Sequence, residues 1–264
     1  MQHHSTVDAA RRHLSAVDPA ALRHARDRLA ETGIARLGFL LPHRVKRALA
    51  AEALAIVDHH LDWEAPAAES EATRTAEPPA RHTVDIGSRE VVARGQCIPQ
   101  LYDCEPLRHK LAEVASQHVL SCPAPRRFAV RRRHHDDVVG QWHWDDYAFA
   151  LVLVVECPPL EDGGFVQTVA HTRRDWDHSD IHRTLTRNPI HSWELTAGDL
   201  YLMRTDTTLH RVHPFAHGRR TIVGMHFASV EEAEREEWND AEQTDRNQTD
   251  SLRSEVRAMT KQAQ

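Results

Sequence analysis

The run YAFALVLVVE at residues 147–156 constrains the fold most. β-Branched and aromatic residues fill it, which is typical of a central strand of a sheet. Shorter strand patterns surround it: RFAVRRR, VVGQWHW, FVQTVAHT, SWEL, GDLYLMR, TTLHRVHPF and RTIVGMHFAS. Turn signals containing Gly and Pro, such as PPLEDGG, separate several of them. Short strands joined by such turns predict an antiparallel sandwich or jelly roll over residues 126–230.

The chain before this sheet has a helical pattern. Residues 6–62 are rich in Ala, Leu and Arg, with apolar positions three or four apart, and residues 105–121 repeat the pattern. Pro19 suits the first turn of a helix, and Gly33 suits a helix end. Between the helices, IARLGFLL at residues 34–41 predicts a short strand.

Two segments break the regular patterns. Residues 63–81 contain three prolines among Ala, Glu and Thr and predict a loop, and residues 175–190 predict a polar insertion. We therefore expect a helical region at 1–125 that belongs to the same domain as the sheet. A β core at 126–230 follows, and a charged helix and tail at 231–264 ends the chain.

Composition limits the class of protein. The 264 residues suit one large domain, and a net charge of −6 argues against a general nucleic-acid-binding protein. The chain has neither a long apolar span nor an apolar signal region near its start, so we expect no membrane contact. Cys97, Cys104, Cys122 and Cys157 lack paired metal-type spacing and indicate reduced thiols in a cytoplasmic protein.

The stretch QWHWDD at residues 141–146 carries two candidate metal ligands, His143 and Asp145. On a strand, residues two apart point to the same face, so these side chains can converge at a strand end. Two histidines and one carboxylate commonly hold non-haem Fe(II). His210 is the best candidate for the second histidine. It lies 65 residues after Asp145, room for about four strands, which in an antiparallel barrel can bring the two segments together.

An arginine pair follows the second histidine. If the iron uses 2-oxoglutarate, the distal carboxylate of this cosubstrate needs a cation inside the barrel, and a bidentate arginine is the natural partner. Arg219 and Arg220 lie nine and ten residues after His210. Strand alternation allows only one of them to point inward, and the spacing does not decide which.

These residues belong to a longer pattern, HWDDYAFALVLVVECPPLEDGGF followed by AGDLYLMRTDTTLHRVHPFAHGRRTIVGMHF. The pattern resembles the Fe(II)/2-oxoglutarate-dependent oxygenases. It is most similar to a bacterial group of free-amino-acid hydroxylases and radical halogenases of natural-product pathways. The resemblance covers residues 125–230. It implies an α+β chain built on a double-stranded β-helix, the distorted jelly roll of cupin-like proteins, with N-terminal helices packed on the sheet and a C-terminal helical extension.

The resemblance also implies residue functions. His143, Asp145 and His210 match the catalytic Fe(II) ligands, and Arg219 matches the 2-oxoglutarate anchor, with Arg220 as second choice; O2 is the co-oxidant. In halogenases of this group, a small residue replaces the carboxylate and leaves a coordination position for chloride. Asp145 would fill that position, so the expected activity is hydroxylation of an unactivated C–H bond, or a related oxidation such as desaturation.

The neighbouring residues suggest how a substrate is bound. The expected substrate is a small molecule, a free amino acid or a related amine-bearing metabolite. Gln141 should share the face of the first ligand and line the pocket, and Asp146 either holds a substrate amine or caps a turn. Trp142 and Trp144 are expected to pack in the core. His213 lies at an odd offset from the second histidine and should face away.

Two alternatives remain open. The basic run of Arg126, Arg127 and Arg131–Arg133 indicates a solvated face. Alternatively, these arginines bind an anionic substrate or the surface of a carrier protein. For the whole chain, the alternative is a jelly-roll metal-binding protein without oxygenase activity, such as a cupin-like isomerase or sensor, which would not need the arginine. Neither nucleic acid nor membrane is an expected partner, and a homodimer is compatible with the helical ends.

Overall fold

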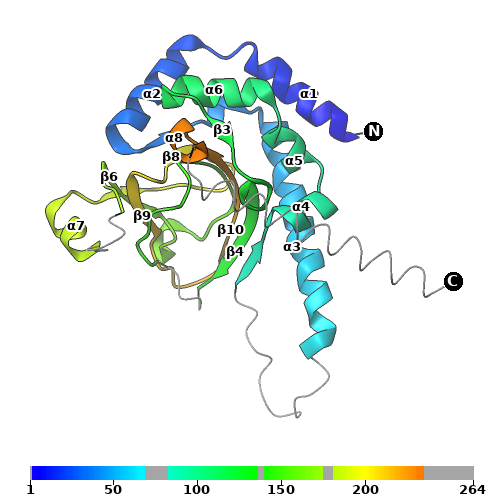
Figure 1. Ribbon diagram of the computed structural model, residues 1–264. Coiled ribbons are helices and arrows are strands. Elements are labelled where there is room, and N and C mark those ends of the chain that lie inside the picture. Colours follow the sequence, from blue (N-terminus) through cyan, green and yellow to red (C-terminus); the bar gives the residue numbers. More distant parts are fainter. Residues whose placement is uncertain (1, 69–82, 136–139, 175–180, 235–264) are drawn as a thin grey trace, which may run out of the picture.

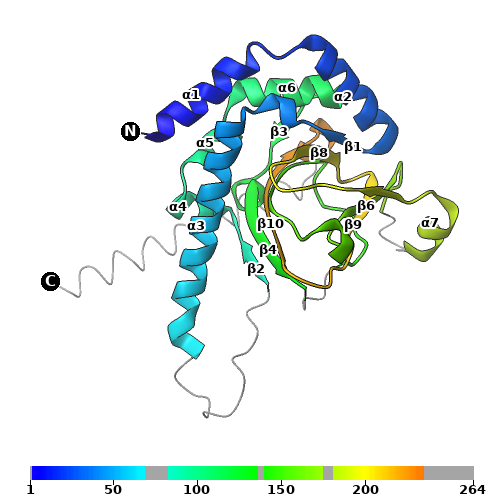
Figure 2. The same ribbon diagram turned by 180° about the vertical axis from the view of Figure 1, so that it is seen from behind.

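The computed structural model describes residues 2–68, 83–135, 140–174 and 181–234 (Figure 1). The first six helices gather along one side of the β-sheets, and the seventh lies on the other side, as Figure 2 shows from behind. The helices are α1 (Gln2–Leu14), α2 (Pro19–Thr32), α3 (His43–Ala68), α4 (Ser88–Arg94), α5 (Cys97–Tyr102), α6 (Glu105–Ala115), α7 (Ile181–Arg187) and α8 (Val230–Ala233).

The ends of α2 follow from local sequence. The Asp18 side chain accepts a hydrogen bond from the Ala20 N–H at 2.8 Å, and Pro19 occupies the first turn, where no N–H is required. Gly33 ends the helix in the left-handed region with φ 73°, and its N–H donates to the Leu29 carbonyl. The predictions for Pro19 and Gly33 are therefore confirmed.

Other helix boundaries differ from the prediction. α3 continues to Ala68 through WEAPAA despite Pro66, so the predicted loop at 63–81 begins too early. The rest of that loop, 69–82, lies outside the described residues. α6 stops at Ala115 instead of residue 121, because Ser116 adopts a left-handed φ of 55°.

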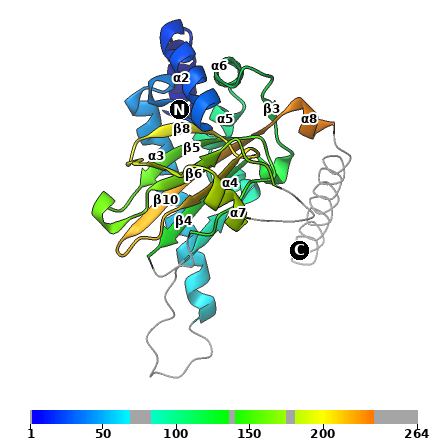
Figure 3. The ribbon, with the colours of Figure 1, turned by 90° about the vertical axis from the view of Figure 1, so that its left-hand side faces the viewer.

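The strands form two antiparallel sheets. The major sheet has the order β1-β8-β5-β10-β4-β2, with β3 paired to β10, and the minor sheet has the order β7-β6-β9. Figure 3 shows β8, β5, β10 and β4 side by side. The strands are β1 (Ile34–Arg36), β2 (Val84–Ile86), β3 (Leu120–Ser121), β4 (Phe128–His134), β5 (Phe149–Glu156), β6 (Val166–Ala170), β7 (His191–Trp193), β8 (Leu200–Arg204), β9 (Thr208–Val212) and β10 (Arg219–Ala228). The run at 147–156 thus forms a central strand, β5, as predicted.

The two faces of the major sheet have different neighbours. On one face, Leu151, Leu153, Val223 and Phe227 join the buried residues of the N-terminal helices in one core. On the other face, a second apolar cluster joins this sheet to Val166 of the minor sheet. Because side chains alternate along a strand, β5 and β10 each supply residues to both faces. The chain is therefore a mixed α+β protein whose main sheet has helices on one side and the minor sheet on the other.

One predicted strand does not form. Of VVGQWHW, the described residues from Gly140 onward are irregular apart from a single antiparallel bridge between His143 and His210. Gly140 adopts φ 98°, and a β-carbon there would press on Pro214 and the Val212 carbonyl. From this turn the chain reaches β9, beside which it forms only the one bridge instead of a continuous strand pairing.

Three further segments were predicted in part. IARLGFLL forms only the short β1, followed by a 3-10 turn at Gly38–Leu40. The polar insertion contains α7, and its residues 175–180 lie outside the described residues. The charged C-terminal segment begins with α8, and residues 235–264 also lie outside them.

All four cysteines lie within the described residues, and none of them forms a disulfide bond. Within the described ranges, no helix combines the length and apolar character needed to cross a membrane.

Candidate metal centre

The candidate site joins two segments that are far apart in sequence. His143 and Asp145 come from the irregular segment before β5, and His210 comes from β9. The His143 N–H donates to the His210 carbonyl at 3.0 Å, and the His210 N–H donates to the His143 carbonyl at 2.9 Å. Four strands, β5 to β8, lie between the two segments. The prediction that these segments lie side by side is confirmed.

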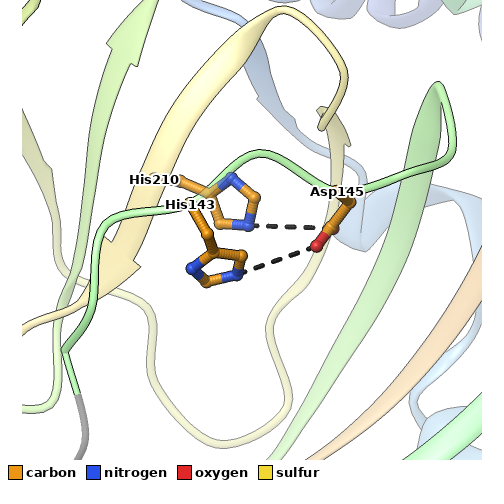
Figure 4. A group of neighbouring side chains, drawn as sticks. All are labelled: His143, Asp145 and His210. Carbon is orange, nitrogen blue, oxygen red and sulfur yellow. Dashed lines mark ion pairs between the residues drawn. The ribbon is translucent and has the colours of Figure 1, made fainter. Parts of the chain in front are cut away.

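The three side chains converge on one point (Figure 4). One Asp145 oxygen lies 3.7 Å from His143 Nε2, and the other lies 3.7 Å from His210 Nε2. One potential ligand atom from each residue falls within 4.8 Å of the others. Two imidazole nitrogens and a carboxylate oxygen on one side of a point form the donor set of a facial triad.

Hydrogen bonds fix the orientation of both imidazole rings. His143 Nδ1 lies 2.9 Å from the Gln141 carbonyl, and His210 Nδ1 lies 2.9 Å from the Thr208 carbonyl. A carbonyl only accepts, so each Nδ1 carries the hydrogen and each Nε2 presents a lone pair toward Asp145. Burial also lowers the pKa of His210, which favours the neutral, metal-binding form.

Trp144 holds the ligand segment in the core. Its indole N–H donates to the Thr172 hydroxyl at 3.0 Å, and the Leu209 N–H donates to the same oxygen at 3.0 Å. One hydroxyl therefore ties the residue between the first two ligands to the residue before the third. Trp144 is buried, as expected for core packing, whereas Trp142 is half-buried with the Arg211 guanidinium 4.8 Å from its ring centre.

A cavity of about 270 Å³ lies between the two sheets and includes the triad on its wall. Alternate residues of the major sheet line it: Ala150 and Val152 of β5, Tyr201 and Met203 of β8, and Ile222 and Gly224 of β10. Val166 and Val212 of the minor sheet face them. The triad therefore adjoins a chamber with an apolar stretch of wall.

The structure corrects the first choice of arginine. Arg219 lies outside this cavity: its side chain is 53% exposed, and its Nε and Nη2 contact one Glu156 oxygen, each at 2.8 Å. Arg220 is 5% exposed and lines the cavity. The expectation that only one of the pair points inward holds, but the inward residue is Arg220.

Arg220 presents unused hydrogen-bond donors. Its Nε and Nη2 are buried and have no hydrogen-bond partner among the described residues. Tyr201 and Cys157 lie beside its guanidinium; burial raises the pKa of both, and the arginine charge opposes the increase. A buried guanidinium with unpaired N–H groups in a cavity is unfavourable unless an anion binds there.

The remaining predicted positions differ in their surroundings. Gln141 lines the cavity with the triad. Asp146 does not: its carboxylate is exposed, lies 3.5 Å from Arg174, and forms part of a second cavity of about 290 Å³. His213 lies away from the triad, stacked on Phe165 with 4.4 Å between ring centres.

The sequence pattern did not place Tyr147 or His226 at the site, and it assigned Arg131 to a basic run that indicated a solvated face first; all three residues line the cavity. His226 is buried, stacks on Tyr147 at 4.0 Å and has a pKa lowered to about 4 by burial and by Arg131. The alternation of side chains along a strand could have identified His226, because His226 lies six residues after Arg220 and therefore shares its face. The same alternation puts neighbouring residues of β4 on opposite faces: Arg131 lines the cavity, whereas buried Arg132 lies on the helix-covered face.

The comparisons with known proteins agree with this geometry. The family HalD, described as Halogenase D, matches residues 17–247. No curated protein matches the chain. Among solved structures, the chain is similar to the non-heme alpha ketoglutarate dependent epimerase SnoN from nogalamycin biosynthesis. The identity is 16%, 81% of this chain and 82% of that chain are covered, and the TM-score is 0.57.

Two further structures have the same architecture. The alpha ketoglutarate dependent carbocyclase SnoK from nogalamycin biosynthesis is 12% identical over 82% of this chain and 86% of its own, with a TM-score of 0.55. AviO1 from Streptomyces viridochromogenes Tue57 is 15% identical over 79% and 95%, with a TM-score of 0.53. At these identities the likeness is one of fold, namely the double-stranded β-helix fold of the 2-oxoglutarate oxygenases.

Proposed function

Because this chain belongs to the halogenase D family, and because its triad adjoins a buried cationic anchor, we propose that it is an Fe(II)- and 2-oxoglutarate-dependent oxygenase. The reaction proposed is hydroxylation of an unactivated C–H bond in a small molecule. In it, 2-oxoglutarate is oxidised to succinate and CO2, and the substrate gains one oxygen atom from O2.

The donor set fits iron. His143, Asp145 and His210 present two neutral imidazole nitrogens and one carboxylate on one side of a point, which leaves the other coordination positions open toward the cavity. The three residues would hold Fe(II). The bound iron, together with 2-oxoglutarate and O2, would supply the oxidant for the C–H bond.

Arg220 is the single observation that carries the cosubstrate assignment. Its unpaired Nε and Nη2 lie in the same cavity as the triad, beside Tyr201. The Nε and one Nη of a guanidinium form a fork that matches a carboxylate. Arg220 would therefore bind the distal carboxylate of 2-oxoglutarate. A cupin-like metal-binding protein without oxygenase activity would bind no anionic cosubstrate at this buried guanidinium.

Asp145 supports hydroxylation over halogenation despite the family's description. A carboxylate ligand at this position occupies the coordination site that a halide would need. Val152, Met203 and Ile222 form an apolar part of the cavity wall, which would exclude water from the reacting atoms. Desaturation is the related outcome for a substrate held in a different orientation.

The proposed substrate is a free amino acid or a related amine-bearing metabolite. Gln141 lies on the cavity wall, where its side-chain amide would donate a hydrogen bond to the substrate. Asp146 would reach an amine only from the adjoining cavity, where it is exposed to solvent. Arg131, Tyr147 and His226 form the wall that the two cavities share.

Turnover in the presence of chloride tests this proposal. The protein is supplied with Fe(II), 2-oxoglutarate, O2 and candidate amino acids in chloride buffer, and succinate and product masses are measured. The proposal predicts succinate release that depends on the substrate and a product that gains one oxygen atom. A product in which chlorine replaces hydrogen would contradict the hydroxylase assignment, and the absence of any 2-oxoglutarate consumption would contradict the oxygenase assignment.

A further inference from the structure

The cavity has more positive charge than iron and 2-oxoglutarate require. Arg131, Arg133, Arg211 and Arg220 line it, whereas Asp145 is the one carboxylate on its wall within the described residues. A divalent metal and dianionic 2-oxoglutarate cancel each other in charge. Even when the neighbouring Asp85 is included, arginines exceed carboxylates by two. A second anion would therefore be favoured here, beyond the cosubstrate.

Two of the arginines are engaged by the protein itself. Arg133 donates through Nη1 to the Val84 and Arg132 carbonyls and through Nη2 to Asp85, each at 3.4 Å. Arg211 donates through Nε to Gln167 at 2.7 Å and lies over an aromatic ring. These contacts fix both guanidinium groups as parts of the wall.

Arg131 also has a protein partner, but it lies nearer the metal ligands. It donates through Nε to Asp85 at 3.2 Å, and its charge acts on Tyr147. Its side chain keeps 36% of its surface exposed, so a ligand can reach it. The charge of Arg131 bears on Tyr147, His210 and His226, all at the metal end of the cavity.

The positions of Arg131 and Arg220 in the sheet would separate the anions that they bind. In the pairing of β10 with β4, Ile222 lies opposite Arg131 and Arg220 lies opposite Arg133. Arg220 therefore sits two residues farther along the sheet, next to Tyr201 and Cys157, whereas Arg131 sits beside Tyr147. If Arg220 binds the distal carboxylate of 2-oxoglutarate, a different anion near the metal would meet Arg131, whose partner Asp85 has a side chain that is 49% exposed.

Arg131 also lies where a substrate can enter. With Tyr147 and His226, it belongs to both the central cavity and the second cavity. A molecule that occupies the second cavity would meet the guanidinium before it reaches the triad. This position suits a group that fixes the substrate while its C–H bond faces the metal.

We propose that Arg131 binds a carboxylate of the primary substrate and thereby selects acids over their neutral analogues. The inference rests on the proposed function, because it assumes that 2-oxoglutarate occupies the Arg220 end. Of the alternatives that the sequence left open for the basic run, this inference selects binding of an anionic substrate, and it assigns that binding to Arg131.

The test uses anaerobic protein loaded with Fe(II) and 2-oxoglutarate, whose visible charge-transfer band responds to a molecule bound near the metal. Proteinogenic L-amino acids and short dicarboxylic acids are added, each beside its carboxamide, and apparent Kd values are obtained from the change in the band. The wild type should respond to an acid and not to the matching amide. Arg131→Gln should weaken binding of that acid by roughly 10- to 100-fold, as expected for a charge-assisted hydrogen bond. Arg131→Lys should recover part of the loss.

Arg219→Gln is the matched control, because this arginine lies outside the cavity. It should bind the acid as the wild type does. An equal response to acid and amide, or no response to any acid, would overturn the inference. Loss of the 2-oxoglutarate band itself in Arg131→Gln would assign Arg131 to the cosubstrate instead. Absence of the band in the wild type is a separate result, since it would remove the proposed function together with this inference.

Discussion

At the residue scale, Arg219 and Arg220 have opposite environments although they are neighbours. Arg219 pairs with Glu156 on the outside, and Arg220 reaches into the cavity. The spacing from the second histidine identified this pair of arginines. It did not show which of the two faces the cavity, because a sequence separation does not say which residues of a strand point to which face. The rest of β10 contains this information: Gly224 and His226 alternate with large apolar residues that face the helices, so residues at even positions, including Arg220, face the cavity.

The ligand function of Asp145 gives a direct prediction. Asp145→Gly removes one of three donors from the candidate centre and should lower hydroxylation by more than about 100-fold, since changes even to outer-shell partners cost about 10–100-fold. The same change opens a coordination position to chloride. Succinate release and product mass, measured with and without chloride, check both expectations. Full hydroxylase activity in Asp145→Gly would show that this carboxylate is not a ligand.

At the element scale, the sequence predicted the strands better than their connections. Uninterrupted apolar residues identified β5, and short strand-like patterns identified β6 to β10, because these depend on local composition. The ligand segment from Gly140 was predicted as a strand and is irregular instead. Its course depends on the packing of Gly140 against Pro214, a contact between residues far apart in sequence.

The backbone of the loop before β6 closely approaches the backbone of the segment that follows β9. Gly163 has φ 105°, and a β-carbon there would overlap the Pro214 carbonyl, whereas Gly198 has φ 92° and open space around it. Gly198→Ala should lower the free energy of unfolding by about 1–2 kcal/mol, from the left-handed backbone alone. Gly163→Ala should add roughly 1–3 kcal/mol for overpacking. Urea denaturation measures both variants, and equal losses would contradict the close approach.

At the scale of the whole molecule, the major sheet separates a helix-packed core from the candidate site. Buried His226 lies on the site face, and its pKa is lowered to about 4 by burial and by Arg131. In the unfolded chain a histidine titrates near 6.5, so the unfolded state takes up the proton first as the pH falls. Stability is therefore complete above about pH 6.5 and decreases as the pH falls toward 4.

This linkage predicts the acid sensitivity of the metal-free protein. His226 should contribute a loss of about 3 kcal/mol between pH 6.5 and 4, from the difference between the two pKa values. Unfolding free energies at a series of pH values, compared between wild type and His226→Gln, measure this contribution. The variant should lose less stability on acidification. His217→Gln, at a site whose side chain is 78% exposed, is the control and should retain the wild-type slope. Identical slopes for all three proteins would refute the assignment.

The most direct test of the central claim is an anaerobic absorbance titration with Fe(II) and then 2-oxoglutarate. The wild type should develop the weak visible band of iron bound to a keto acid. Arg220→Gln should require at least about 10-fold more 2-oxoglutarate, because it loses a charge-assisted pair, and Arg219→Gln should titrate like the wild type. Absence of the band in the wild type, or equal behaviour of the two variants, would contradict the account.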